Sequence, residues 1–212
     1  MSPTHQAARP AYWGDACAAL SEADPVLAEL IGRYPDAHLH SRGEPFVTLV
    51  RAIVGQQIST RAADAVWGRL QAAVPALSPQ ALLAVPEVAL RDAGLSGRKV
   101  EYTRDLARHF ADGLLDPDSF ARMDDQALID ALVAVRGIGR WSAEMFLIFN
   151  QLRADVWPVD DIGLQRAVGR HYLHGISPTP KALRQFGQRF APWRTVATWY
   201  LWRSLDPETV LY

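Results

Sequence analysis

The segment LVAVRGIGRWSAEMFLIF, residues 132–149, decides the fold. Its apolar residues recur at helical spacing on both sides of the turn RGIGR at 136–140, which predicts two helices joined by a hairpin. Gly137 and Gly139 permit positive φ and close approach of another backbone, and Ile138 fills the gap between the helices. The N–H groups that open the second helix have no intrahelical acceptor, so the turn is able to hold a phosphate oxygen. An ordinary connection between two helices is the alternative interpretation.

Helical periodicity extends from this hairpin over nearly the whole chain. Ala-, Leu- and Arg-rich segments alternate with Pro- and Gly-containing breaks. The strongest strand pattern, DVWPV at 155–159, contains a proline, which argues against a central strand. We therefore expect an all-α protein, and the Pro- and Gly-rich stretch 32–45 and a second junction near 151–160 suggest a division into two helical lobes. The expected boundaries give one lobe of residues 43–154 and a second of residues 1–42 together with 155–212.

Composition excludes several classes of protein. The chain has 212 residues, of which 49% are hydrophobic and 21% are charged, and this balance is typical of a folded globular protein. Its single cysteine, Cys17, excludes a disulfide framework and a four-cysteine zinc or iron–sulfur site within the chain. The sequence has neither a long apolar run nor a signal-peptide pattern, so we expect a soluble intracellular protein.

Charge is distributed unevenly along the chain. The net charge is −1 overall, −5 over residues 1–135 and +4 over residues 136–212. A chain divided in this way can present a basic face while it remains nearly neutral. Only Lys99 and Lys181 among the 22 basic residues are lysines, and arginine suits phosphate contacts, although a high arginine content also follows from the base composition of a genome.

The hairpin resembles that of the helix–hairpin–helix DNA glycosylase superfamily, whose motif reads L-x-x-h-P-G-h-G-x-x-T-A with h apolar. The chain matches it at Leu132, Val135, Gly137, Ile138, Gly139 and Ala143, with Arg136 in place of the proline and Ser142 in place of the threonine. The stretches PFVTLVRAIVGQQIS (45–59), AGLSGRKVEYTRDLA (93–107) and APWRTVATWYLWRSL (191–205) look like the bacterial 3-methyladenine DNA glycosylase II branch. The resemblance covers about 45–212, most of the chain.

This resemblance implies an active-site cleft between the two lobes and a monomeric enzyme of base excision repair. The expected reaction is hydrolysis of the N-glycosidic bond of flipped-out alkylated purines in double-stranded DNA, of the 3-methyladenine and 7-methylguanine type. We expect no cofactor, no metal and no membrane partner, and a cytoplasmic location at the nucleoid. The alternatives are a glycosylase for a deaminated or oxidised purine and a noncatalytic hairpin module that binds DNA.

The resemblance also identifies a catalytic aspartate in WPVDDIGLQRAV, residues 157–168. Asp161 aligns best with the family's catalytic position, and Asp160 is then a cap or a supporting group. A carboxylate there stabilises the positive charge that builds on the sugar and orients the attacking water. Without the resemblance, capping of the helix that starts at Ile162 is the commoner use of both aspartates.

Base recognition is expected from four residues. The resemblance places Trp141, Met145, Ile162 and Trp202 at the base pocket. Trp141 and Met145 are four residues apart on one helix, so they share a face, and an indole attracts a cationic alkylated purine. Bifunctional relatives carry a lysine where Trp141 stands, which predicts a monofunctional enzyme. Core packing is the alternative interpretation of both tryptophans.

DNA binding is expected from the hairpin and from a second loop. The hairpin residues are Gly137, Ile138, Gly139 and Arg140. The stretch GQQIS interrupts a helical segment, and Gln57 matches the position that enters the space left by a flipped nucleotide. A polar helix junction explains Gln57 equally well. Arg98, Lys99 and Arg140 are either phosphate contacts or solvated surface.

Overall fold

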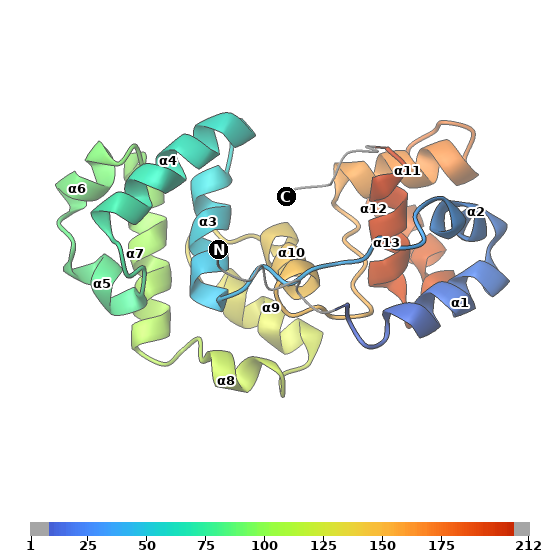
Figure 1. Cartoon of the computed structure of the whole chain (residues 1–212), viewed down its shortest axis with the longest axis horizontal. Helices are drawn as coiled ribbons and strands as arrows, with labels where there is room; N and C mark the ends of the chain where they lie inside the picture. Colours follow the sequence, from blue (N-terminus) through green and yellow to red (C-terminus); the bar gives the residue numbers. More distant parts are fainter. Residues whose placement is uncertain (1–8, 206–212) are drawn as a thin grey trace. The chain divides into compact units, whose positions relative to one another are not determined.

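The structure is a computed structural model that describes residues 9–205, and every regular element in that range is a helix (Figure 1). The expected all-α class is confirmed. The elements are α1 (Trp13–Ala23), α2 (Pro25–Arg33), α3 (Pro45–Gly55), α4 (Thr60–Ala73), α5 (Pro79–Ala84), α6 (Glu87–Asp92), α7 (Gly97–Ala111), α8 (Pro117–Phe120), α9 (Asp125–Val133), α10 (Arg140–Phe149), α11 (Ile162–Tyr172), α12 (Pro180–Phe186), the 3-10 helix η1 (Gly187–Phe190) and α13 (Arg194–Arg203). Within the described range, none of these helices combines the length and the apolar character that crossing a membrane requires.

The chain forms two compact units, which we call the hairpin lobe and the carboxylate lobe. The hairpin lobe is Arg42–Phe146, and the carboxylate lobe is the chain up to Ser41 together with the chain from Leu147. The expected boundaries lay after residues 42 and 154, so residues 147–154 fall in the other unit. The reason is packing: Phe149 stacks on Trp202, and the carbonyls of Leu152 and Arg153 accept hydrogen bonds from Tyr12 and Thr195 of the carboxylate lobe.

The hairpin lobe is built around the long helix α7. Helices α3, α5 and α6 pack on α7, and α4 packs on α3 and α6. Four phenylalanines from four helices form a chain of edge-to-face contacts through this core: Phe46, Phe110, Phe120 and Phe146. Edge-to-face rings add to the burial energy of the core. This core fixes α10, which follows the hairpin turn, and α7, which packs against the turn.

The carboxylate lobe is built around α13. This helix contacts α1, α2 and α11, and it buries side chains on nearly all sides. A helix that is buried all round shows no amphipathic stripe, which explains the Trp- and Tyr-rich sequence of α13. Its burial fixes Trp202, which is 2% exposed, next to the first turn of α11.

Capping side chains mark where several of the helices begin. Ser59, Ser96, Asp124 and Asp161 each accept a backbone N–H as the N-cap of α4, α7, α9 and α11. Such caps satisfy amides that have no intrahelical acceptor. The stretch GQQIS separates α3 from α4, and we call residues 56–59 the wedge turn.

Candidate functional site

The turn between α9 and α10 adopts the predicted hairpin. Gly137 has φ +82°, and a Cβ at this position would lie 2.2 Å from Cδ2 of Tyr102 on α7. Glycine is therefore required twice, once by the backbone and once by the tyrosine ring. Ile138 is 5% exposed and fills the space between the helices, as its place between two glycines predicts. A Cβ on Gly139 would meet no described atom within 4 Å, so this side of the turn is open to a ligand.

The backbone groups of the turn divide into paired and open ones. The N–H of Arg136 donates to Oδ2 of Asp105 at 2.9 Å, and the N–H of Ile138 donates to the carbonyl of Val135 at 3.2 Å. Among residues 9–205, no hydrogen bond engages the N–H of Gly139. This amide stands directly before α10, whose positive dipole end favours an anion. The geometry suits a phosphate oxygen, as the sequence predicts.

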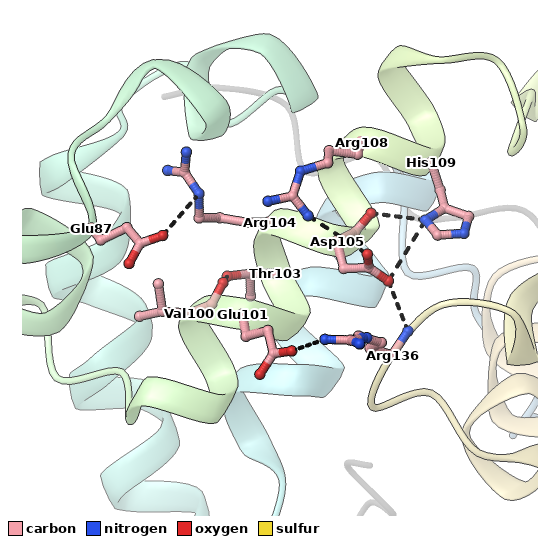
Figure 2. A network of polar contacts seen from close by, with 9 residues as sticks. All are labelled: Glu87, Val100, Glu101, Thr103, Arg104, Asp105, Arg108, His109 and Arg136. Atoms are coloured by element: carbon pink, nitrogen blue, oxygen red, sulfur yellow. Dashed lines mark hydrogen bonds and ion pairs between the residues drawn. The ribbon is translucent and has the colours of Figure 1, made fainter.

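Helix α7 holds the turn from behind through a polar network (Figure 2). Arg136 pairs with Glu101, and its backbone N–H reaches Asp105. Asp105 also faces Arg108 at 3.6 Å and Nδ1 of His109 at 3.8 Å. A proline at position 136, as in the family motif, would have no N–H to give to Asp105. The departure from the motif therefore adds a hydrogen bond to the back of the hairpin.

Asp161 is both a helix cap and a rigidly held carboxylate. Its Oδ1 accepts the N–H of Leu164 at 2.6 Å and Nε1–H of Trp202 at 2.7 Å, and the residue is 5% exposed. A Cβ on Gly163 would lie 3.0 Å from this oxygen and 3.2 Å from Cδ1 of Trp202. Glycine at 163 thus allows the indole to reach the carboxylate. Asp160, by contrast, is exposed.

The four residues expected at a base pocket differ in exposure. Trp141 is 39% exposed and Met145 is 8% exposed, both on α10. Ile162, the first residue of α11, is 62% exposed. Trp202 is packed in the core, with its ring stacked on Phe149 at 5.9 Å between centroids. The contacts of Trp202 therefore make it a support for Asp161, a role that the sequence does not suggest.

Gln57 lies at the exposed apex of the wedge turn. Its φ is +58°, a left-handed conformation that is uncommon for a residue other than glycine. Ile58 beside it is 39% exposed. A left-handed, exposed residue is compatible with both interpretations of Gln57, because such conformations occur at functional contacts as well as in tight turns.

The candidate phosphate contacts separate into different environments. Arg98 is exposed at the start of α7. Lys99 instead donates from Nζ to the carbonyl of Val54 at 2.7 Å, and burial lowers its pKa. Arg140 donates to Glu144 at 3.0 Å and to Gln126 at 3.2 Å. Lys99 is thus engaged in holding the end of α3.

Beside these residues, a cavity or a metal-binding cluster could also form a functional site. A cavity of about 300 Å³ between α6 and α7 is lined by arginines and glutamates, but Arg104 within it donates to the carbonyls of Val85 and Leu83 and so fastens helices together. In the part of the chain from residue 9 to residue 205, no group of three His, Cys, Asp or Glu side chains is placed to hold a metal ion.

Sequence reasoning missed the residues that support the site. They are Gln56, Tyr102, Asp105, Phe149 and Gly163. A signal existed for one of them, because a glycine two residues after a capping aspartate allows close approach of another group. The others contact partners far away in the sequence, so no local pattern marks them.

Comparisons with known proteins place the chain in a family. A family model described as HhH-GPD superfamily base excision DNA repair protein matches residues 50–192. The chain is 33% identical over 188 residues to DNA-3-methyladenine glycosylase 1 of Schizosaccharomyces pombe, which covers 84% of this chain and 80% of that protein. The crystal structure of a DNA-3-methyladenine glycosidase from Bacillus halodurans matches with a TM-score of 0.83 and 37% identity over 92% of this chain and 89% of that one. A Schizosaccharomyces pombe 3-methyladenine DNA glycosylase in complex with abasic DNA matches with a TM-score of 0.77 and 30% identity over 92% of this chain and 99% of that one.

Proposed function

The chain belongs to the HhH-GPD superfamily of base excision DNA repair proteins, and from that membership we propose that it hydrolyses the N-glycosidic bond of alkylated purines in double-stranded DNA. Purines of the 3-methyladenine and 7-methylguanine type are the proposed substrates, in line with the names of its relatives. The observation that carries the proposal is the Asp161 carboxylate, which is 5% exposed and fixed by two hydrogen bonds.

Asp161 supplies the catalytic charge. Positive charge builds on the sugar as the base leaves, and a nearby carboxylate stabilises it. Because this carboxylate is buried, its attraction for the developing charge is less screened than it would be in water. The same group orients the attacking water and accepts its proton. An alkylated purine is already cationic and leaves readily, so a single carboxylate suffices.

Recognition of the flipped base is assigned to Trp141, Met145, Ile162 and Trp202. The exposed indole of Trp141 supports this role, because an indole face attracts a cationic purine. Trp141 has no nucleophilic amine, so the sugar is not trapped as a Schiff base and strand cleavage does not follow. The product is an abasic site.

DNA contact is assigned to the hairpin and to the wedge turn. The open amide of Gly139 and the start of α10 take a phosphate, with Gly137 and Ile138 shaping the turn and Arg140 beside it. Gln57 enters the space that the flipped nucleotide leaves. We further propose that the protein acts as a monomer in the cytoplasm, at the nucleoid.

Base release from methylated duplex DNA tests the proposal. We expect wild-type protein to release alkylated purines and to leave strand breaks that appear only after hot alkali. Asp161→Asn should abolish release while folding and DNA binding persist, because asparagine still accepts the N–H groups of Leu164 and Trp202.

The matched control is Asp160→Asn, which changes the exposed neighbour and should have a milder effect. The reverse ranking of the two variants would refute the assignment of Asp161. Strand breaks without alkali would refute the assignment of Trp141 and a purely hydrolytic reaction.

A further inference from the structure

The wedge turn is tied to the rest of the hairpin lobe by two side chains. Gln56 donates from Nε2 to the carbonyl of Gly137 at 2.9 Å, and Lys99 donates from Nζ to the carbonyl of Val54 at 2.7 Å. The two bonds hold the chain just before Gln57, one at the last turn of α3 and one at the wedge turn itself. The apex is thus left exposed while its base is fixed.

The bond from Gln56 is specific in its partner. It joins residues 81 positions apart, and the acceptor is the carbonyl of the glycine that forms the hairpin. A carbonyl can only accept, so the amide nitrogen of Gln56 is the atom that faces it. Gln56 is half-buried, where water competes less well for the bond than at the surface.

The hairpin is rigid at the point where Gln56 attaches. The Tyr102 ring packs against Gly137, and Asp105 holds the N–H of Arg136 on the same side. The carbonyl of Gly137 therefore has a fixed position relative to the open amide of Gly139. Any phosphate on that amide is then at a fixed distance from the wedge turn.

We propose that Gln56 is a positioning residue that couples the phosphate-binding hairpin to the wedge turn. When the hairpin seats on the backbone, Gln56 sets the depth at which Gln57 enters the duplex. This inference rests on the proposed function, because it needs DNA on the hairpin and a flipped nucleotide. Lys99 serves as a second tie and not as a phosphate contact.

Three properties of the protein should respond differently if Gln56 acts through Gln57. Loss of the tie should weaken extrusion of a paired base. It should leave the affinity of the hairpin for phosphate nearly unchanged, since the amides remain. It should also leave the chemistry at Asp161 unchanged once a base is extruded, since that carboxylate is held by Leu164 and Trp202 of its own lobe.

The test uses Gln56→Leu, which keeps the size of the side chain and removes the donor, with Gln57→Ala and the double variant beside it. Base extrusion is followed by the fluorescence of 2-aminopurine in a bound duplex, and base release by single-turnover hydrolysis of 7-methylguanine, paired or mispaired. We expect Gln56→Leu to lower extrusion and release of the paired lesion roughly fivefold, the size expected for one hydrogen bond. The mispaired lesion, which needs little extrusion, should be released at nearly the wild-type rate.

The double variant decides whether Gln56 acts through Gln57. We expect it to be no worse than Gln57→Ala alone, whereas two independent roles would give the product of the two losses. Three outcomes would each overturn the proposal. They are a double variant whose loss is the product of the two single losses, equal losses on paired and mispaired lesions, and wild-type extrusion and release by Gln56→Leu. A wild type that extrudes 2-aminopurine but releases no base would overturn the proposed function alone, and the fluorescence series would still judge Gln56.

Discussion

At the scale of single residues, Asp161 combines the capping role that the structure shows with the catalytic role that we propose. As the N-cap of α11 it accepts the N–H of Leu164, and this bond fixes the side-chain rotamer. The bond from Trp202 to the same oxygen restrains the carboxylate from a second direction. Capping and the proposed catalysis are therefore not rival explanations of this residue, because the cap would preorganise the charge.

Trp202→Phe tests the support for Asp161. Phenylalanine keeps an aromatic ring on Phe149 but has no N–H for the carboxylate. We expect base release to fall roughly ten- to a hundredfold, the range for a hydrogen bond to a charged group, while DNA affinity stays close to that of the wild type. Single-turnover kinetics and a binding titration measure the two effects.

The matched control is Trp199→Phe, which removes an indole from the same helix where it packs on Tyr200. It should leave base release unchanged. An equal loss in both variants would show that damage to α13, and not the bond to Asp161, is responsible.

Gly163→Ala tests how closely the carboxylate is positioned. The added Cβ would lie 3.0 Å from Oδ1 of Asp161 and 3.2 Å from Cδ1 of Trp202, so one of these groups must shift by a few tenths of an ångström. We expect base release to fall on the order of tenfold, because small misplacements of a catalytic group are costly. The free energy of unfolding should change little.

Gly68→Ala is the control for this substitution. Gly68 lies in the interior of α4, and a Cβ there would meet no described atom within 4 Å. It should raise the free energy of unfolding by about 0.5–1 kcal/mol and leave base release unchanged. Wild-type rates for Gly163→Ala would contradict the tight packing around Asp161.

At the scale of elements, the hairpin is an assembly of four helices rather than of the two that it joins. Helix α7 supplies Tyr102 and Asp105, and the wedge turn directly after α3 supplies Gln56. The turn alone contains an exposed glycine and few internal bonds. Its shape therefore depends on groups that are remote in the sequence and that lie within the same lobe.

Gly137→Ala measures this dependence. The substitution forces a Cβ to 2.2 Å from the Tyr102 ring and places alanine at φ +82°. We expect the free energy of unfolding to fall by about 2–4 kcal/mol, since steric overlap and backbone strain add. Urea denaturation measures the loss, and a binding titration should show weaker affinity for DNA.

Repeating the substitution in a Tyr102→Ala background separates the two causes. The ring is then absent, and only the cost of left-handed backbone remains, about 1–2 kcal/mol. An undiminished cost in that background would mean that the ring moves away freely and does not shape the turn.

At the scale of the whole molecule, the sequence predicts the helices better than the contacts between them. The hairpin, the all-α class and the capping role of Asp161 follow from local patterns, because turns and caps are encoded by neighbouring residues. The bonds from Gln56 to Gly137 and from Trp202 to Asp161 join residues far apart. No periodicity marks such pairs, so the second role of Trp202 emerges only from the folded chain.

The lobe boundary shows the same limit. The sequence-based boundary lies after residue 154, whereas the compact units divide after residue 146 inside α10. Within one continuous helix, the sequence has no signal for the residue at which the helix stops belonging to one lobe and starts belonging to the other. The division depends on which core buries each turn of the helix, and that is decided by packing.

The order of the lobes along the chain has a consequence for synthesis on the ribosome. The hairpin lobe is one uninterrupted stretch, so all of its residues have been synthesised once residue 146 is made. Helices α1 and α2 are made earlier, yet the helix that buries them, α13, is made last. Helices α1 and α2 therefore stay exposed during synthesis until α13 has been made, while the hairpin lobe folds. We expect a nascent-chain chaperone to shield these two helices.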